Sequence, residues 1–476
     1  MMARQHCLLT LIAVGTYQKK TLMPSEARSP QESESASTAP AGLAKLTLTR
    51  PFSIPMRIQE VSDMTVQKIA GCKQLVRATG EHWLDAHRLR LYGSAALFCY
   101  AAFFGIWMFR AWILAVPGLF PPGGDFVVFW SAANVALEHG GAAPYNYDLL
   151  VAKELFAVPG LHVGEGKLPW LYPPTFLLPV LALGMLPYGI AAIVFLLGGV
   201  GWYGWAMYRT LPWRSAWIAA MGFPGVAVVV ATGQNSLWLA GTLGLALTLM
   251  RRRPALAGVL LGLVTVKPHL AIVLPLALLC ARQWRALLGM MASALLLALL
   301  SLACFGVEPF LAFLHAAEVV RTAVQNGEAI LVRMPTMFAA AKLLFGGVVL
   351  PYAVHGAFAC AAAASVIYAW SRPCSFALRA AVLSIALLLV PPYLYDYDLA
   401  FLAIAIAWLG IHANRCGWLT GERELLVVLW LLPLYGLLAG SWIGVQLMPL
   451  GLVLALALAT WRVRLERTSG KASNEA

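Results

Sequence analysis

The chain has 476 residues, of which 61% are hydrophobic and only 12% are charged, and its mean hydropathy is +0.76. Soluble domains carry about 25% charged residues, so this composition excludes an ordinary soluble protein and is typical of an integral membrane protein. The net charge of +13 resides in short basic clusters between apolar runs. That pattern is typical of cytoplasmic loops, and we therefore expect no nucleic-acid partner.

The first 80 residues differ in composition from the remainder of the chain. Residues 25–41 are rich in Ser, Pro, Glu and Ala, a composition that predicts disorder. Before them, the run CLLTLIAVG follows Arg4 and imitates a short secretory signal, although a long polar stretch separates it from the first apolar segment. We interpret residues 1–80 as a disordered extension or as the product of a mis-assigned start, with Met56 or Met64 as the alternative start.

Apolar runs recur from Tyr92 to Trp461. Each crossing of a bilayer needs about 20 apolar residues, so these runs predict an all-α membrane domain over residues 81–467 with about ten to twelve transmembrane helices. A cytoplasmic tail is expected at 468–476. The expected segments are 92–114, 175–207, 215–231, 234–250, 254–281, 286–306, 347–370, 376–392, 397–411, 424–440 and 443–461.

Basic residues between these segments predict the orientation, because cytoplasmic loops are enriched in Lys and Arg. Arg88 and Arg90 place the start of the first segment in the cytoplasm. The other basic groups are Arg209 with Arg214, Arg251 to Arg253, Arg282 with Arg285, Arg372 with Arg379, Arg415, and Arg462 with Arg464 and Arg467. Placing them all inside requires 254–281 to be a hairpin of two short helices that turns at Lys267. It also requires Pro187 to break 175–207 into a re-entrant piece and a span.

The loop at residues 115–171 is too polar to cross the membrane and lies outside under this topology. Within it, FVVFWSAANVALEH predicts an amphipathic helix over 126–139. Its aromatic residues suit an element that lies on the outer surface as a lid for a lipid-linked substrate. Asp125 precedes this helix, after two glycines. We interpret it as a turn or N-cap residue or as a catalytic carboxylate, and the two roles are compatible.

The other polar residues at the outer ends of the segments form a short set. They are Tyr172, Gln234, Asn235, Lys267 and His269, then Glu308, His315, Glu318, Arg321, Glu328 and Arg333 in a loop at 307–335, and Asp396 and Asp398 in PPYLYDYD. Ionisable groups at membrane depth are costly and usually mark function. We interpret Lys267 either as a helix-end lysine that snorkels to the interface or as a cation that meets a phosphate group, assisted by backbone amides opened by Pro268.

The sequence contains no GxxxxGK[ST] phosphate loop, no nucleophile elbow and no HExxH zinc motif. An enzyme site would therefore be assembled from residues on several helices. A transporter or flippase is the alternative function, because such proteins are also polytopic with basic loops. Transporters tend to carry internal repeats and midplane polar groups, whereas this sequence shows no repeat and its polar residues lie towards one face. An envelope polymerase or ligase would fit the same topology.

Three segments, in order between Gly123 and Gly289, resemble those of one family. They are GGDFVVFWSAANVALEHGGAAPYNYD, WLYPPTFLLPVLALGMLPYGIAAIVFLL, and a longer stretch that begins GQNSLWLAG and contains VKPH. The family is glycosyltransferase family 87, whose members are polyprenol-phosphate-mannose-dependent mannosyltransferases with the GT-C fold. The resemblance implies a GT-C-like helical bundle with mannosyltransferase activity.

The resemblance also implies roles for individual residues. Asp125 matches the family's first-outer-loop aspartate, which is the general base in GT-C enzymes. The residues GQNS at 233–236 match the motif G-Q-x-N, with Ser236 in the fourth position if the spacing shifts by one. Lys267 and His269 flank the proline of a motif that faces the donor phosphate. PPYLYDYD stands where relatives carry a polar-aromatic motif of different wording.

These residues suit an inverting transfer from a polyprenyl-phosphate sugar. Asp125 would take the proton from the acceptor hydroxyl, and Lys267 with His269 would stabilise the charge of the leaving phosphate. The candidates for the sugar hydroxyls are Gln234, Asn235 and Asp396, and the further site candidates are Tyr172, Arg321, Arg333 and Asp398.

We therefore expect a multi-pass enzyme of the inner (plasma) membrane, with its site facing the periplasm or the exterior. Its partners would be a lipid-linked sugar donor, carrying a hexose with mannose favoured, and a lipid or glycan acceptor. A lipid-phosphate donor lacks the pyrophosphate that soluble transferases usually hold with a metal. No cofactor and no obligatory metal are therefore expected, although Asp125, Asp396 and Asp398 offer ligands for one.

Overall fold

The computed structural model describes residues 82–114, 122–158, 168–435 and 443–472, together with the single residues 116, 119 and 161. Across these residues every regular element is a helix. In this described part, seven helices are long and apolar enough to cross a membrane, and five shorter apolar helices accompany them. These findings confirm the predicted all-α polytopic membrane fold. The expected extension at 1–80 lies outside the described residues.

The described helices alternate between long spans and short, broken pieces. As far as Cys280 they are α3 (Ala86–Met108), η1 (Phe109–Ile113), α4 (Phe126–His139), η2 (Ala143–Tyr145), α5 (Tyr147–Ala157), α6 (Pro174–Gly184), α7 (Tyr188–Thr210), α8 (Arg214–Met221), α9 (Pro224–Thr232), α10 (Ser236–Leu249), α11 (Pro254–Leu263), η3 (Val264–Val266), α12 (Pro268–Ala271) and α13 (Leu274–Cys280). After it come α14 (Trp284–Phe305), α15 (Glu308–Asn326), η4 (Leu331–Arg333), α16 (Met337–Phe345), α17 (Val349–Trp370), α18 (Phe376–Leu389), η5 (Asp396–Phe401), α19 (Leu402–Cys416), α20 (Glu422–Tyr435) and α22 (Met448–Ala472). The predicted tail at 468–476 therefore begins inside α22.

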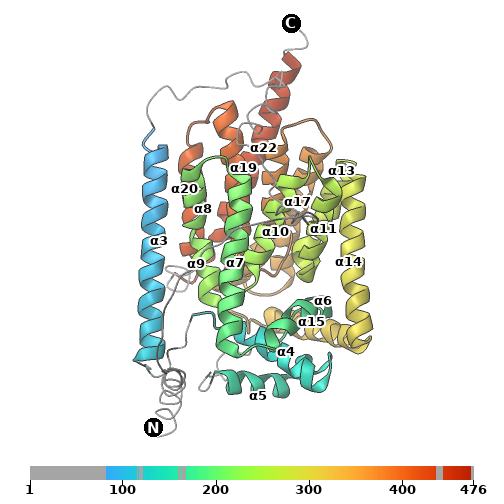
Figure 1. The fold of residues 1–476 in the computed structure, drawn as a ribbon. Coiled ribbons are helices and arrows are strands. Elements are labelled where there is room, and N and C mark those ends of the chain that lie inside the picture. The colour runs from blue at the N-terminus through green and yellow to red at the C-terminus, as the bar shows by residue number, and fades with distance from the viewer. Residues whose placement is uncertain are drawn as a thin grey trace, which may run out of the picture. The chain divides into compact units, whose positions relative to one another are not determined.

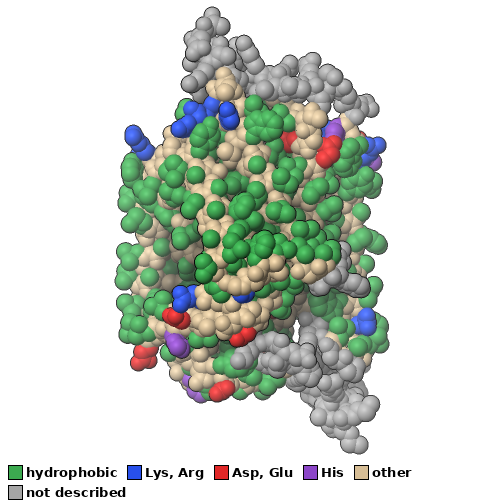
Figure 2. Space-filling view, turned by 180° about the vertical axis from the view of Figure 1, so that it is seen from behind, with side chains coloured by type: hydrophobic (Ala, Val, Ile, Leu, Met, Phe, Trp, Pro, Cys, Tyr) green, Lys and Arg blue, Asp and Glu red, His purple; other side chains and the backbone are tan. Residues whose placement is uncertain are grey.

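The long helices run roughly side by side, and α4, α5, α6 and α15 are gathered across one end of them (Figure 1). The beginning of α3 and the end of α22 lie at the opposite end. Figure 2 shows hydrophobic side chains over the middle of one face and charged side chains mostly near its two ends. Following the positive-inside expectation, we call the end with α4 the outer end and the end with the terminus of α22 the cytoplasmic end.

Prolines divide two of the predicted apolar segments. In the segment 175–207, α6 ends at Gly184 and α7 begins directly after Pro187, which confirms the predicted break. The segment 215–231 corresponds to one candidate membrane span, Arg214–Thr232, within which α8 ends at Met221 and α9 begins at Pro224. Proline has no N–H to donate and is tolerated in the first turn of a helix, so it starts a new helix more readily than it continues one.

The predicted hairpin is present, and Lys267 lies between its limbs. α11 and α14 run in the same direction, because Gly258 lies against Ala286 and Gly262 lies further along against Ser293. The intervening chain must therefore return to the end at which α11 began, which places Lys267 at the tip of the hairpin. A Cβ atom at Gly258 would collide with the backbone of Ala286, so small residues permit this close helix contact.

The helix predicted over 126–139 is present as α4 at the outer end of the bundle (Figure 1), but the expectation that its aromatic face lies towards the outer surface is wrong. Phe126, Phe129 and Trp130 are buried. The ring of Phe126 packs against Tyr188 and Phe195 of α7. These aromatic side chains belong to the packed core, and they fix the position of the loop that carries Asp125.

The stretch 307–335 was expected to be a loop, and this expectation is also wrong. α15 occupies 19 residues of it. Pro309 in the first turn and Gly327, with φ +84° after the last turn, are ordinary signals for a helix start and stop. The exposed side of α15 carries Leu311 and Leu314 beside Glu318, a mixture that is typical of a helix in the membrane interface.

Candidate active site

Backbone contacts attach the Asp125 loop to the end of α9. The N–H of Gly123 donates to the carbonyl of Ala231 at 2.8 Å, and the N–H of Asp125 donates to the carbonyl of Thr232 at 2.7 Å. Gly233 has φ +83°, and a Cβ atom there would collide with the carbonyl of Gly123. Glycine is therefore required at the point where the two turns meet, and this contact places Asp125 beside Gln234.

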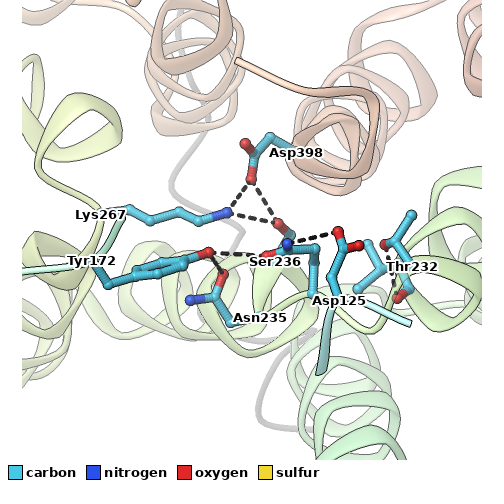
Figure 3. A network of polar contacts seen from close by, with 9 residues as sticks. Asp125, Tyr172, Thr232, Asn235, Ser236, Lys267 and Asp398 are labelled. Atoms are coloured by element: carbon cyan, nitrogen blue, oxygen red, sulfur yellow. Dashed lines mark hydrogen bonds and ion pairs between the residues drawn. The ribbon is translucent and has the colours of Figure 1, made fainter. Parts of the chain in front are cut away.

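A chain of hydrogen bonds extends from Asp125 to the start of α6 (Figure 3). Gln234 Nε2 donates to Asp125 Oδ2 at 2.9 Å. The Tyr172 hydroxyl lies 2.9 Å from Gln234 Oε1 and 3.3 Å from Asn235 Oδ1. Asp125, Gln234 and Tyr172 are all half-buried, whereas Asn235 is buried. Solvent or a substrate can therefore reach the first three residues but not the last.

Asp125 occupies the N-cap position of α4, but its side chain makes no capping hydrogen bond. The carboxylate accepts from Gln234 instead. Burial raises the pKa of the Asp125 carboxyl above its ordinary value, while the Gln234 hydrogen bond and the positive charge of Arg333 act in the opposite direction. The side chain therefore does not act as the helix cap that the sequence offered as one interpretation.

Lys267 is buried and paired, so it does not snorkel to a membrane surface. Its ammonium nitrogen lies 2.8 Å from Asp398 Oδ1 and 3.2 Å from Ser236 Oγ, and Ser236 Oγ itself donates to Asp398 Oδ1 at 2.6 Å. Figure 3 shows the lysine reaching across to Asp398, with the Tyr172 ring beside it. The Tyr397 ring lies 4.8 Å from the ammonium nitrogen. The lysine is therefore held on several sides by groups from three parts of the chain.

A second ion pair lies near Asp125. Arg333 donates from Nε and Nη2 to the two oxygens of Asp396, each at 2.9 Å. Asp396 is fully buried, but 32% of the Arg333 side chain is exposed. The charges of both residues act on Asp125. This bidentate contact holds the guanidinium group in one orientation while leaving part of it accessible.

Two further candidates differ in their placement. The His269 side chain is exposed and lies within electrostatic reach of Asp398 and Lys267, so it belongs to the edge of the same cluster. Arg321 is exposed on α15 and pairs with Glu318 at 2.7 Å. No contact connects it to the cluster in the described part of the chain, and we leave it out of the site.

Two further residues join the cluster: Tyr397, which the sequence did not single out, and Ser236, which it named only as the fourth residue of the G-Q-x-N match. Ser236 directly follows Gln234 and Asn235, and Tyr397 lies between Asp396 and Asp398, so both are adjacent in sequence to predicted residues. The carboxylates of the cluster contact Gln234, Arg333 and Lys267. Among the described residues no group of three His, Cys, Asp or Glu side chains is arranged as a metal site.

The fold and the site define a polytopic membrane protein in which Asp125, Lys267, Arg333, Asp396 and Asp398 form a partly accessible cluster at the outer end of the bundle. Residues 170–392, slightly less than half of the chain, match the model of glycosyltransferase family 87. This match supports the family resemblance of the sequence and indicates a membrane glycosyltransferase. No curated protein and no solved structure matches the chain. Tyr172, Gln234, Lys267 and Arg333 lie within the matched residues, whereas Asp125 lies before them.

Proposed function

We propose that the chain transfers a hexose, with mannose as the first candidate, from a polyprenyl-phosphate donor to a lipid or glycan acceptor. The reaction would take place on the non-cytoplasmic face of the inner (plasma) membrane and would follow the GT-C pattern. The observation that supports it best is the half-buried Asp125 carboxylate, which is held by Gln234 beside two cationic residues. A membrane glycosyltransferase needs such a base together with positive charge for its leaving group.

Asp125 is proposed to act as the general base. Its carboxylate takes the proton of the acceptor hydroxyl as the acceptor oxygen attacks the anomeric carbon, and the bond from that carbon to the phosphate breaks. The Gln234 amide holds one carboxylate oxygen through its 2.9 Å hydrogen bond, so the carboxylate keeps a fixed direction. The raised pKa of Asp125 makes it a stronger base than an exposed aspartate.

Arg333 is proposed to meet the leaving phosphate directly. Its contacts with Asp396 use two of the five N–H groups of a guanidinium, and the side chain is partly exposed. The remaining N–H groups can stabilise the negative charge that develops on the phosphate. Lys267 is proposed to act on the phosphate by its positive charge without direct contact, because its ammonium is already bound to Asp398 and Ser236. His269 lies at the edge of the same cluster.

Tyr172, Gln234 and Asn235 are proposed to recognise sugar hydroxyls, since they present hydroxyl and amide groups beside Asp125. The donor carries one phosphate, and two cationic groups lie at the site to meet it, Arg333 and Lys267, which are oriented by their pairs with Asp396 and Asp398. We therefore propose that the reaction requires neither a cofactor nor a metal. Transfer should continue unchanged in excess EDTA.

The direct test is transfer by the purified full-length protein in liposomes. Polyprenyl-phosphate mannose and polyprenyl-phosphate glucose, each radiolabelled in the sugar, are supplied with a membrane lipid extract as acceptor. We expect labelled product from the mannose donor, and Asp148→Asn should serve as a control because that acid is exposed on α5. Movement of donor across the bilayer without any transfer would instead favour a flippase, and absence of transfer from either donor would overturn the proposal.

A further inference from the structure

A large cavity lies away from the candidate active site, between α3, α8, α19 and α20. Its volume is about 1360 Å³, which exceeds the usual range of about 300–1,000 Å³ for small-molecule sites. Along α19 its lining extends from Ala403 to Asn414. The residues of the outer cluster do not line it, and from Ala403 the lining continues along α19 towards the cytoplasmic end.

The cavity exists because α3 packs on the bundle mainly through α8. Gly93 of α3 lies against the backbone of Ala219, and the Tyr100 hydroxyl donates to the carbonyl of Gly222 at 3.2 Å. Beyond this contact, α19 lines the cavity with the small residues Ala403, Ala407 and Gly410 and with the larger Ile406 and Ile411. Together with residues of α3 they enclose an apolar space that the contact between α3 and α8 does not fill.

The depth of the cavity matches one leaflet of a bilayer. The 11-residue step from Ala403 to Asn414 corresponds to about 16 Å at 1.5 Å per residue. Half of a hydrocarbon core of about 30 Å is about 15 Å. The apolar part is therefore as long as the acyl chains of a single leaflet, and its open end lies where that leaflet's headgroups would be.

The cytoplasmic mouth of the cavity is basic and aromatic. Arg88 and Arg423 contribute to it together with one acid, Asp85, whereas the third basic residue, His82, is paired with Glu424 at 2.8 Å. The carboxylate of Asp85 accepts from the backbone N–H of Arg88 at 2.7 Å. The guanidinium of Arg423 lies 4.8 Å from the ring of Trp418. Arginine and tryptophan together are typical of the headgroup level of a membrane.

We propose that this cavity binds a phospholipid with an anionic headgroup from the cytoplasmic leaflet. Its acyl chains lie in the apolar space between α3 and α20, and its phosphate lies between Arg88 and Arg423. Basic pockets between transmembrane helices on the cytoplasmic side are known to hold anionic lipid headgroups. The lipid fills the space beside the contact between α3 and α8. It thereby adds to the attachment of α3, near whose start His82 pairs with Glu424 of α20 at 2.8 Å.

The proposal is tested with the delipidated full-length protein in detergent, without any need for transfer activity. Phosphatidylglycerol and phosphatidylcholine with the same acyl chains are titrated, and bound lipid is counted by native mass spectrometry while the melting temperature is recorded. We expect phosphatidylglycerol to bind more tightly and to raise the melting temperature, and inorganic phosphate alone to have no effect. Equal binding of the two lipids would overturn the proposal.

Variants assign the binding to this cavity. The double variant Arg88→Gln and Arg423→Gln should weaken phosphatidylglycerol binding about thirtyfold, because each basic residue near an anionic lipid contributes about 1 kcal/mol and 1.4 kcal/mol is tenfold. Ala407→Trp fills the apolar part and should reduce the binding of both lipids. Arg372→Gln is the matched control, since Arg372 lies over the Tyr368 ring at the same 4.8 Å but outside the cavity. If the control weakens binding as much as the double variant does, the lipid is not held here.

Discussion

Two buried ion-pair regions at opposite ends of the bundle show how differently similar charges are used. At the cytoplasmic end, Glu422 and Arg462 are paired and almost inaccessible, with 1% and 4% of their side chains exposed. Arg462 also donates to the carbonyl of Gly417 at 2.8 Å, and Glu422 accepts from the backbone N–H of Leu419 at 2.9 Å. This pair is closed on all sides and joins α20 to α22.

The outer cluster contains an equally buried pair, Lys267 with Asp398, but its neighbours are open. Asp125 is half-buried, and 32% of the Arg333 side chain is exposed. Burial of charge in a membrane protein is therefore no sign of a site by itself, because a buried pair also serves as a structural contact. The sign of a site is a buried pair that supports accessible, incompletely paired groups.

The largest expected effect that follows from this comparison is on catalysis. Asp125→Asn keeps the size of the side chain but removes the base, so the transfer rate should fall by about a hundred- to ten-thousandfold with little change in melting temperature. The rate of the unaltered enzyme should also fall as the pH is lowered, because the carboxylate must be ionised to accept a proton. Since burial raises the pKa of Asp125, this loss should begin above the pH at which an exposed aspartate is protonated. A variant rate within a few-fold of wild type would remove Asp125 from the mechanism.

The second prediction compares the two pairs directly. Lys267→Met and Arg462→Met each leave a buried carboxylate alone, and each should lower the free energy of unfolding by about 3–5 kcal/mol. The double variants Lys267→Met with Asp398→Leu, and Arg462→Met with Glu422→Gln, should recover much of that loss.

Transfer activity then separates the two regions. The transfer rate should return in the cytoplasmic double variant and stay low in the outer double variant. Only the outer double variant removes a cation, Lys267, that is proposed to act on the donor phosphate. Melting curves and initial rates of the four variants check this pattern. Full activity in the outer double variant would make Lys267 and Asp398 a structural pair like Glu422 and Arg462.

A smaller effect is expected for Arg333→Lys. Lysine keeps the positive charge but cannot bind Asp396 and a phosphate together in the fixed geometry of a guanidinium. A charge-assisted hydrogen bond contributes about 1.5–3 kcal/mol, so kcat/KM for the donor should fall about tenfold or more. Arg321→Lys on the exposed side of α15 is the matched control and should have no effect. Equal rates for the two variants would exclude a direct phosphate contact by Arg333.

The smallest expected effect concerns Glu154 of α5, a buried carboxyl whose two oxygens have no hydrogen-bond partner in the described structure. Burial raises its pKa to about 8. The carboxyl is therefore neutral in the folded protein at pH values where it is ionised in the unfolded chain. Stability from this group is present at low pH and is lost as the pH rises towards 8.

Glu154→Gln removes the ionisation and should flatten this part of the dependence of melting temperature on pH. Transfer at neutral pH should not change, because Glu154 contacts none of the residues of the outer cluster. An unchanged pH profile of melting temperature would show that the carboxyl is ionised and accommodated in the folded state.

Much of the helical architecture follows from the sequence, because a bilayer selects apolar runs of a set length whatever their neighbours are. The breaks at Pro187 and at Lys267 follow from proline chemistry and from the cost of charge at depth. The sequence did not predict α15, because its ionisable residues suggest a loop. It predicted that the aromatic face of α4 lies at the outer surface, because aromatic residues fit a membrane interface as well as a core.

The sequence alone determined that the chain is a polytopic membrane protein with Asp125, Gln234 and Lys267 as site candidates. Only the tertiary structure decided that Lys267 pairs with Asp398 and that Arg333, not Arg321, joins the cluster. The physical reason is that hydropathy acts on each helix separately, whereas an ion pair depends on which helices pack together and which faces they present. Those contacts join residues that are far apart in the chain, so they cannot be predicted from a local sequence pattern.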